Sequence, residues 1–239
     1  MPNTPTKLRS KLITWHLTDS ALPTGAFAHS AGLETYIQRD IVSDAASYSA
    51  WLSAYLLQAS YTEALALRFA MEMATSERSD EEKLDGLAEL DRLCHVSQTP
   101  RQVRTSMNAM GKRMAKVATI TVSDDPLISA YLAGIDDGTY HGNPGIAAGL
   151  AFGASQISIE DGVYAYLLQM ASSMTQNAIR GIPLGQDAGQ RVLAESYAYI
   201  EKSGAATLEH TLADLGSVAP GLEVAQMMHE SLHSRMFMS

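Results

Sequence analysis

The 239-residue sequence contains a single cysteine, Cys94, and therefore cannot form an internal disulfide. One cysteine fits a reducing compartment, and residues 1–9 lack the apolar core of a signal peptide. No stretch approaches the ~18 uncharged apolar residues that a membrane-spanning helix needs. We therefore expect a cytoplasmic protein without a membrane segment, in which residues 1–9 are flexible.

Basic residues are also few: 17 Lys and Arg stand against 26 Asp and Glu, for a net charge of −9. Binding to nucleic acid or to an anionic membrane depends on an excess of positive charge, so the composition argues against both. Hydrophobic residues make up 46% and charged residues 18%, as in an ordinary globular domain. Because no linker composition divides the chain, we treat residues 1–239 as a single domain.

Strand-like alternation is almost absent, apart from an ambiguous stretch at 117–122. Apolar residues instead recur at helical spacing, so we expect an all-α fold, one globular bundle-like domain of roughly eight to ten helices. The expected long helices cover residues 43–73, 77–92, 101–117, 126–135, 158–180 and 186–202. Shorter helices are expected after 32, from 145, near 208–215 and from 222.

Glycines recur every four residues in one expected helix, at Gly145, Gly149 and Gly153. Each glycine in a helix costs about 1 kcal/mol relative to alanine, so a row of them needs a reason. Small residues on one face allow another backbone to come close. We therefore predict a close helix–helix approach along this line.

Residues 101–117 combine a methionine stripe with a run of basic residues and no acidic one. A methionine stripe at helical spacing is typical of a core. The basic run is either a solvated face or a surface that attracts an acidic partner. The sequence leaves both interpretations of the basic run open.

Patterns that could carry chemistry are weak. Residues 229–233 match H-E-x-x-H, which on a helix could bind zinc through His229 and His233, with Glu230 beside them. Only six residues follow His233, however, and a third ligand and a substrate-holding strand are missing. Residues 28–32 resemble an imperfect nucleophile elbow without a preceding strand, and residues 181–186 lack the ending of a phosphate-binding loop. We predict no catalytic residue, no metal ligand and no cofactor, with a zinc-dependent hydrolase as the alternative.

Several separated segments form a more specific pattern when taken in order. The first consists of Pro23, Gly25, Phe27, Ser30, Gly32, Leu33 and Glu34. The second comprises Gly111-Lys112-Arg113 and His141-Gly142. The third comprises Arg180, Pro183-Leu184-Gly185-Gln186 and Gly189-Gln190-Arg191, and the fourth is the tail H-E-x-x-x-S-R-x-F-x-S from His229 to Ser239. Together they resemble the urease accessory protein family UreF over nearly the whole chain, with Met236 and Met238 as departures in the tail.

The resemblance implies a non-catalytic, all-α chaperone for urease maturation. Such a protein bridges a UreD-type protein, also called UreH, and the GTPase UreG, and couples GTP-dependent nickel delivery to apo-urease. The resemblance also implies a homodimer within the complex. His233 falls on a variable position of the family pattern, which makes the H-E-x-x-H match accidental. An oligomeric helical scaffold unrelated to urease remains the other alternative.

The resemblance also suggests where partners bind. In the C-terminal tail, residues 229–239, we assign the UreD-type protein to Ser234, Arg235 and Phe237. We assign a UreG-facing surface, or the dimer contact, to Tyr36, Arg180, Pro183, Leu184, Gly185 and Gln186. The alternative is purely structural: the proline and glycine end a helix, and the arginine pairs with the last carbonyls of that helix.

Overall fold

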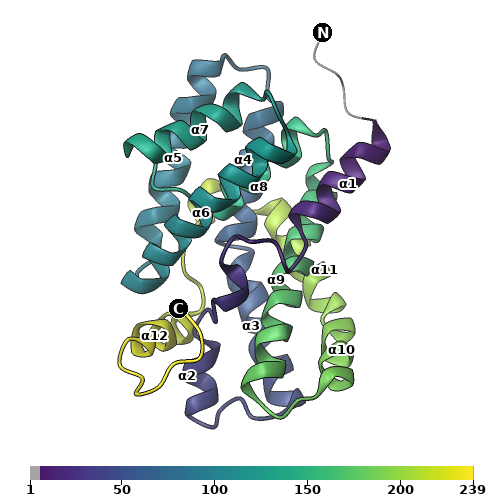
Figure 1. Ribbon diagram of the computed structural model, residues 1–239, viewed down its shortest axis with the longest axis vertical. Helices are drawn as coiled ribbons and strands as arrows, with labels where there is room; N and C mark the ends of the chain where they lie inside the picture. The colour runs from purple at the N-terminus through teal and green to yellow at the C-terminus, as the bar shows by residue number, and fades with distance from the viewer. Residues whose placement is uncertain (1–5, 239) are drawn as a thin grey trace.

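The computed structural model describes residues 6–238, and within them the chain is all-α, as predicted (Figure 1). The helices are α1 (Lys7–Leu17), α2 (Leu33–Gln38), α3 (Ala45–Ala59), α4 (Glu63–Thr75), α5 (Asp80–Ser97), α6 (Arg101–Thr121), α7 (Pro126–Asp137), α8 (Pro144–Ala154), α9 (Ile159–Gly181), α10 (Gln186–Glu195), α11 (Tyr197–Glu209) and α12 (Pro220–His229). Two short 3-10 turns, η1 (Ala26–Ala28) and η2 (Leu212–Asp214), join them. The ambiguous stretch at 117–122 is the end of α6, and no strand occurs in residues 6–238.

The expected helix over 43–73 is divided into α3 and α4, so the prediction of one continuous helix was wrong here. The Ser60 hydroxyl donates to the carbonyl three residues earlier, at 2.7 Å, and so competes with the helical pattern. The carbonyl of Tyr61 accepts from the N–H of Gly216 at 3.0 Å. The break therefore combines a local serine hydrogen bond with a contact from a distant part of the chain.

The expected helix over 186–202 is likewise divided, between α10 and α11. The residue at the break is Ser196, and its hydroxyl donates to the carbonyl of Leu193 at 2.7 Å. The prediction of one helix was wrong for the same physical reason as above, because a buried serine bonds its own backbone. These two breaks make the observed helices shorter and more numerous than the apolar pattern indicates.

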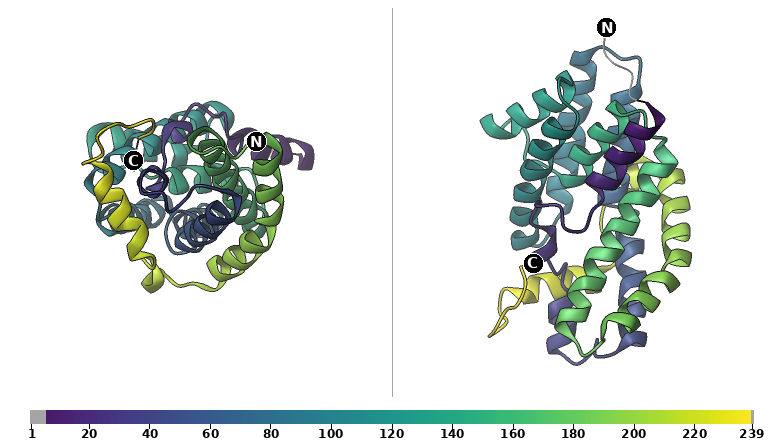
Figure 2. Two further views of the ribbon diagram at one scale, coloured as in Figure 1. Left: turned by 90° about the horizontal axis from the view of Figure 1, so that it is seen from below. Right: turned by 45° about the vertical axis from the view of Figure 1, so that its right-hand side comes forward.

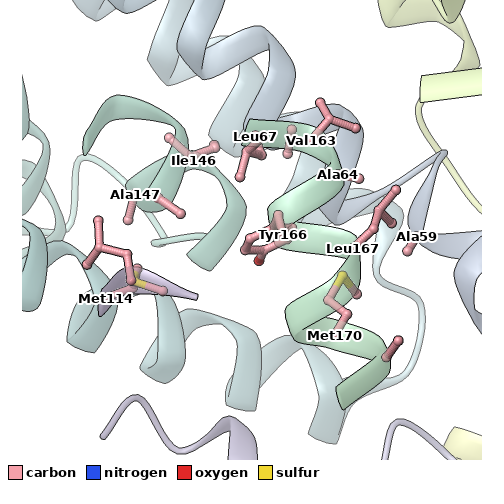
Figure 3. Packing of buried hydrophobic residues seen from close by; sticks show 14 of the residues in the cluster. Ala59, Ala64, Leu67, Met114, Ile146, Ala147, Val163, Tyr166, Leu167 and Met170 are labelled. Carbon is pink, nitrogen blue, oxygen red and sulfur yellow. The ribbon is translucent and has the colours of Figure 1, made fainter. Parts of the chain in front are cut away.

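The core lies where α4, α8 and α9 meet. The helices α5, α6 and α7 gather at one end of the molecule and α3, α10 and α11 at the other (Figures 1 and 2). Figure 3 shows Leu67 of α4, Ile146 of α8 and Tyr166 of α9 pointing toward one another within this core. One buried cluster includes residues of helices from both ends, and a smaller second cluster lies on α6.

The glycine row of α8 faces α4, which confirms the predicted close approach. A Cβ added at Gly145 would lie 2.4 Å from the carbonyl oxygen of Glu63, and one at Gly149 would lie 2.4 Å from that of Leu67. At Gly153 it would lie 2.6 Å from the Cβ of an alanine in α4. Real Cβ atoms do not approach a backbone oxygen so closely, so only glycine allows this packing.

The helix α1 begins at Lys7, where the Thr6 hydroxyl caps it by accepting from the N–H of Arg9 at 3.2 Å. Of the segment 1–9 that we expect to be flexible, residues 1–5 lie outside the described residues. The N-terminal end of α1 projects beyond the neighbouring helices (Figure 2). Among residues 6–238, no helix has both the length and the apolar character needed to cross a membrane.

Candidate functional site

Three segments that are distant in sequence meet near the C-terminal end of the chain (Figure 1). They are residues 25–38, residues 177–186 and residues 229–238, and we call their meeting place the tail junction. The N–H of Met238 donates to the carbonyl of residue 28, and its own carbonyl accepts from the N–H of residue 30, both at 2.7 Å. The tail is therefore folded back onto the chain as a single parallel β-bridge.

A buried carboxylate holds the tail in place. Glu34 of α2 is only 4% exposed and accepts a hydrogen bond from Nε2 of His229 at 2.7 Å. The same carboxylate accepts from the N–H of Phe237, at 3.1 Å, and from the N–H of Met236. Because a carboxylate only accepts, Nε2 of the histidine carries the proton. Charge-assisted hydrogen bonds of this kind are about twice as strong as neutral ones.

Arg180, at the end of α9, connects all three segments. Its guanidinium lies 3.9 Å from the ring centroid of Phe27 and 5.1 Å from that of Phe237. Its Nη2 donates to the Phe27 carbonyl at 2.7 Å and to Oδ1 of Asn177. The Asn177 amide in turn donates to the carbonyl of His29 at 2.8 Å. Partial burial lowers the pKa of the Arg180 guanidinium, which still presents charge at the surface.

The predicted tail residues differ in exposure. Ser234 and Arg235 are exposed, and the Ser234 carbonyl accepts from Nε2 of Gln38 at 2.6 Å. Phe237, by contrast, is only 6% exposed, and its ring lies inside the tail junction. Its place in the structure is thus that of an internal anchor for the tail.

The remaining predicted residues lie in different surroundings. Leu184 is buried in the core, while its neighbours Pro183, Gly185 and Gln186 are exposed. Tyr36 is half-buried against α12, and burial raises the pKa of its phenol. The structure therefore brings Arg180 and Phe237 together, whereas the Tyr36 hydroxyl lies beside α12 and Leu184 belongs to the interior.

The H-E-x-x-H segment does not form two turns of one helix. The helix α12 ends at His229, with Glu230 as its C-cap, and His233 lies beyond it and is exposed. Nε2 of His229 is already bonded to Glu34. Among residues 6–238, no three His, Cys, Asp or Glu side chains are placed to share a metal ion.

The structure also argues against a nucleophile elbow at residues 28–32. The Ser30 side chain is fully buried, and Nδ1 of His29 accepts from the N–H of Ala31 at 3.3 Å. The histidine thus takes part in the local turn that precedes α2.

Two other segments of the family pattern meet beside α6. A Cβ at Gly111 would lie 2.4 Å from the backbone nitrogen of Asn143, so the glycine admits the turn that precedes α8. Nε of Arg113 donates to the carbonyl of Pro23 at 2.9 Å, and Lys112 pairs with an aspartate of α7 at 2.6 Å. The methionine stripe of α6 is buried, which confirms its assignment to the core.

A cavity of about 90 Å³ lies between α3, α4, α6 and α9. Methionine side chains line much of it, including Met107, Met110 and Met170, and Glu63 contributes a carboxyl group. Burial raises the pKa of the Glu63 carboxyl, whose partner is the hydroxyl of Thr62. The volume suffices for a few water molecules, at about 30 Å³ each.

Sequence reasoning missed Glu34, Asn177 and Phe27 as parts of the site. An acidic residue in the first turn of a helix interacts favourably with the helix dipole. This local reason is enough to explain Glu34, so there was no cause to look for a tertiary contact. The only signal in the sequence was that Glu34 and Phe27 belong to the first segment of the family pattern, for which no contact was predicted.

Residues 42–197 match the UreF family profile. The chain is 41% identical over 234 residues to the urease accessory protein UreF of Arthrobacter sp. (strain FB24). The aligned region covers 96% of this chain and 97% of the relative. It is 39% identical over 230 residues to UreF of Paenarthrobacter aurescens (strain TC1), with coverages of 96% and 98%. It is 35% identical over 235 residues to UreF of Corynebacterium efficiens, with coverages of 98% and 99%.

Proposed function

Because the chain belongs to the UreF family of urease accessory proteins, which serve urease maturation, we propose that it is a non-catalytic bridge between a UreD/UreH-type protein and the GTPase UreG. In this role it couples GTP-dependent nickel delivery to apo-urease in the cytoplasm. The observation that carries the proposal is the tail junction, where three segments of the family pattern meet through hydrogen bonds and ring contacts.

The chemistry of the tail junction supports binding in preference to catalysis. Its buried carboxylate, Glu34, accepts from the His229 ring and from two backbone N–H groups of the tail. Its exposed side chains include Arg180 and Arg235, with Phe27 47% exposed beside the former. Arginine and aromatic residues are enriched where protein interfaces gain most of their binding energy.

This arrangement supports the partner assignments that the family resemblance suggests. We assign the exposed Ser234 and Arg235 to direct contact with the UreD-type protein, and Phe237 to holding the tail so that they can make it. We assign the surface around Arg180, Tyr36 and the loop 183–186 to UreG or to the dimer. Within that loop, Leu184 acts from inside by fixing the exposed residues on either side of it.

Co-expression with the UreD-type protein and UreG tests the bridge. The full-length chain should purify as a complex with both proteins, and removal of the segment after Met228 should release the UreD-type protein. Because truncation also removes the buried His229, we add Arg235→Ala, which changes an exposed side chain only. We expect at least a tenfold loss of the UreD-type protein from the complex, about 1.4 kcal/mol of binding free energy.

The matched control is His233→Ala, which truncates another exposed side chain of the same tail. This variant should keep the whole complex, as measured by light scattering on the purified material. If the full-length chain stays alone while both partners are soluble, the bridging role is wrong. If the complex forms but Arg235→Ala leaves it intact, only the tail assignment is wrong.

The helix α1 supports the proposed homodimer. Leu8, Leu12 and Trp15 follow one another at helical spacing on one face of α1, and they are 64%, 53% and 63% exposed. Large apolar side chains grouped on one exposed face mark an interaction surface. The N-terminal end of α1 projects beyond the neighbouring helices (Figure 2), and the exposure of these three side chains leaves the face open to a second copy.

Leu12→Arg should therefore split the dimer. A charge at the centre of an apolar contact remains unpaired when buried, so we expect association to weaken by a hundredfold or more, about 2.7 kcal/mol. Light scattering on the complex should then give half the mass. The control is Ile120→Arg, which places the same charge at a position of α6 that is 72% exposed. An unchanged mass for Leu12→Arg would place the dimer contact elsewhere.

A further inference from the structure

The exposed methionine side chains of residues 6–238 lie at the C-terminal end of the chain. Met227, near the end of α12, is 43% exposed, and Met236 and Met238 of the tail are 66% and 59% exposed. The methionines of α4, α6 and α9 are buried or partly buried, as is Met228. A dissolved reagent therefore reaches the thioether groups of this end most readily.

Hydrogen bonds hold the backbone around the two tail methionines. The Glu34 carboxylate accepts from the N–H of Met236 and from that of Phe237. The N–H and the carbonyl of Met238 bond to the segment 28–30, both at 2.7 Å. Between the two methionines, the Phe237 ring is buried in the tail junction. The two thioethers therefore lie on the outside of an ordered segment, on either side of its internal anchor.

The single cysteine does not compete for the same chemistry. Cys94 is buried in α5, and burial raises the pKa of its thiol. Oxidants react with the thiolate, so a buried thiol of raised pKa is unreactive. Among the sulfur groups of residues 6–238, the exposed thioethers are therefore the ones open to a dissolved peroxide.

Oxidation of a thioether by hydrogen peroxide is a complete two-electron step. A lone pair of the sulfur attacks one peroxide oxygen, and a sulfur–oxygen bond forms while the oxygen–oxygen bond breaks. The second oxygen leaves as water with both hydrogens, so the sulfur is oxidised to a sulfoxide and the peroxide is reduced. A dithiol reverses the step by becoming a disulfide, and the sulfoxide oxygen leaves as water. The forward step turns a flexible apolar side chain into a polar one.

We propose that Met236 and Met238 form a modification site for peroxides, at which oxidation weakens binding by the tail. This inference rests on the proposed function, in which the neighbouring Ser234 and Arg235 contact the UreD-type protein. In that contact the two thioethers supply an adaptable apolar surface next to the arginine. A sulfoxide brings a polar oxygen into the interface, and burying it without a partner opposes binding. Oxidised chains therefore stay out of the complex until a dithiol reduces them.

Treatment of the full-length chain with hydrogen peroxide tests the modification site itself. Mass spectrometry of proteolytic peptides would follow the gain of one oxygen at each methionine over time. We expect Met236 and Met238 to be oxidised at least tenfold faster than the buried Met107, Met110 and Met114 of α6. Equal rates in the tail and in α6 would overturn the inference, and this measurement needs no partner protein.

Binding of the UreD-type protein tests the consequence. The chain oxidised in its tail should bind at least fivefold more weakly, while the amide of Phe237 keeps its protection from hydrogen exchange because its bond to Glu34 is unchanged. The double variant Met236→Leu and Met238→Leu should bind equally before and after peroxide, since leucine has a similar volume and no sulfur. Met227→Leu, the matched control in α12, should remain sensitive to peroxide.

The outcomes separate this inference from the proposed function. Undiminished binding after both tail methionines are oxidised would overturn the inference. A loss of binding of the same size in the oxidised double variant would overturn it as well, because the sensitive group would then lie elsewhere. If the untreated chain fails to bind the UreD-type protein, the proposed function is wrong and the consequence assigned to oxidation falls with it, whereas the oxidation rates still decide the modification site.

Discussion

Gly149→Ala should destabilise the chain by about 3 kcal/mol, although alanine ordinarily favours a helix. The added Cβ would lie 2.4 Å from the carbonyl oxygen of Leu67 and 2.8 Å from the Cβ of Ala70. Both atoms are on or next to the α4 backbone, so neither can move away alone. Every residue of α8 from Pro144 to Gly153 is buried, and the two helices must therefore separate along their whole contact.

Chemical denaturation gives the measurement, with Gly86→Ala as the matched control. A Cβ at Gly86 would lie 2.9 Å from the sulfur and terminal methyl of Met73, the flexible end of a long side chain. This control should be neutral or stabilised by up to about 1 kcal/mol, because alanine restricts the unfolded chain. Similar stabilities for Gly149→Ala and Gly86→Ala would show that the α4–α8 contact tolerates a wider spacing.

Glu34→Gln should release the tail while the rest of the chain stays folded. The carboxylate accepts from His229, Met236 and Phe237. An amide has one oxygen, and its NH₂ group would face N–H donors that it cannot bind. Losing these bonds in a buried site costs about 3 kcal/mol of local stability.

Hydrogen exchange measures this local change directly. The amides of Met236 and Phe237 should exchange about a hundredfold faster in the variant, since every 1.4 kcal/mol corresponds to a factor of ten. Amides in α8 should keep their protection, which distinguishes tail release from general unfolding. The control Glu201→Gln changes an exposed carboxylate and should leave all rates unchanged. Unaltered exchange at both tail amides would mean that other contacts hold the tail.

Features that depend on nearby residues could be predicted from the sequence. The helices α7 and α9 begin where expected, because Asp125 and Ser158 accept from N–H groups three residues later. The glycine row of α8 was interpretable for a related reason, since only a close backbone explains glycine at that spacing. In each case the cause lies within one helix or on one face of it.

Features that depend on distant contacts could not be predicted. At the break between α3 and α4, the N–H of Gly216 donates to the chain, and the sequence near Ser60 does not indicate that partner. The burial of Phe237 could not be predicted from the tail sequence alone. Its ring packs beside the guanidinium of Arg180, which is distant in the sequence. The family pattern indicated which residues to consider but not which of them touch.

The order of folding follows from the separation of the contacts in the tail junction. Glu34 accepts hydrogen bonds from groups that lie 195 to 203 residues further along the chain. Contacts between such distant positions require most of the chain to be ordered first, because closing a long loop costs entropy. The surface around Arg235 is therefore completed only after most of the chain has folded. A partner that recognises it thereby selects finished molecules over partly folded ones.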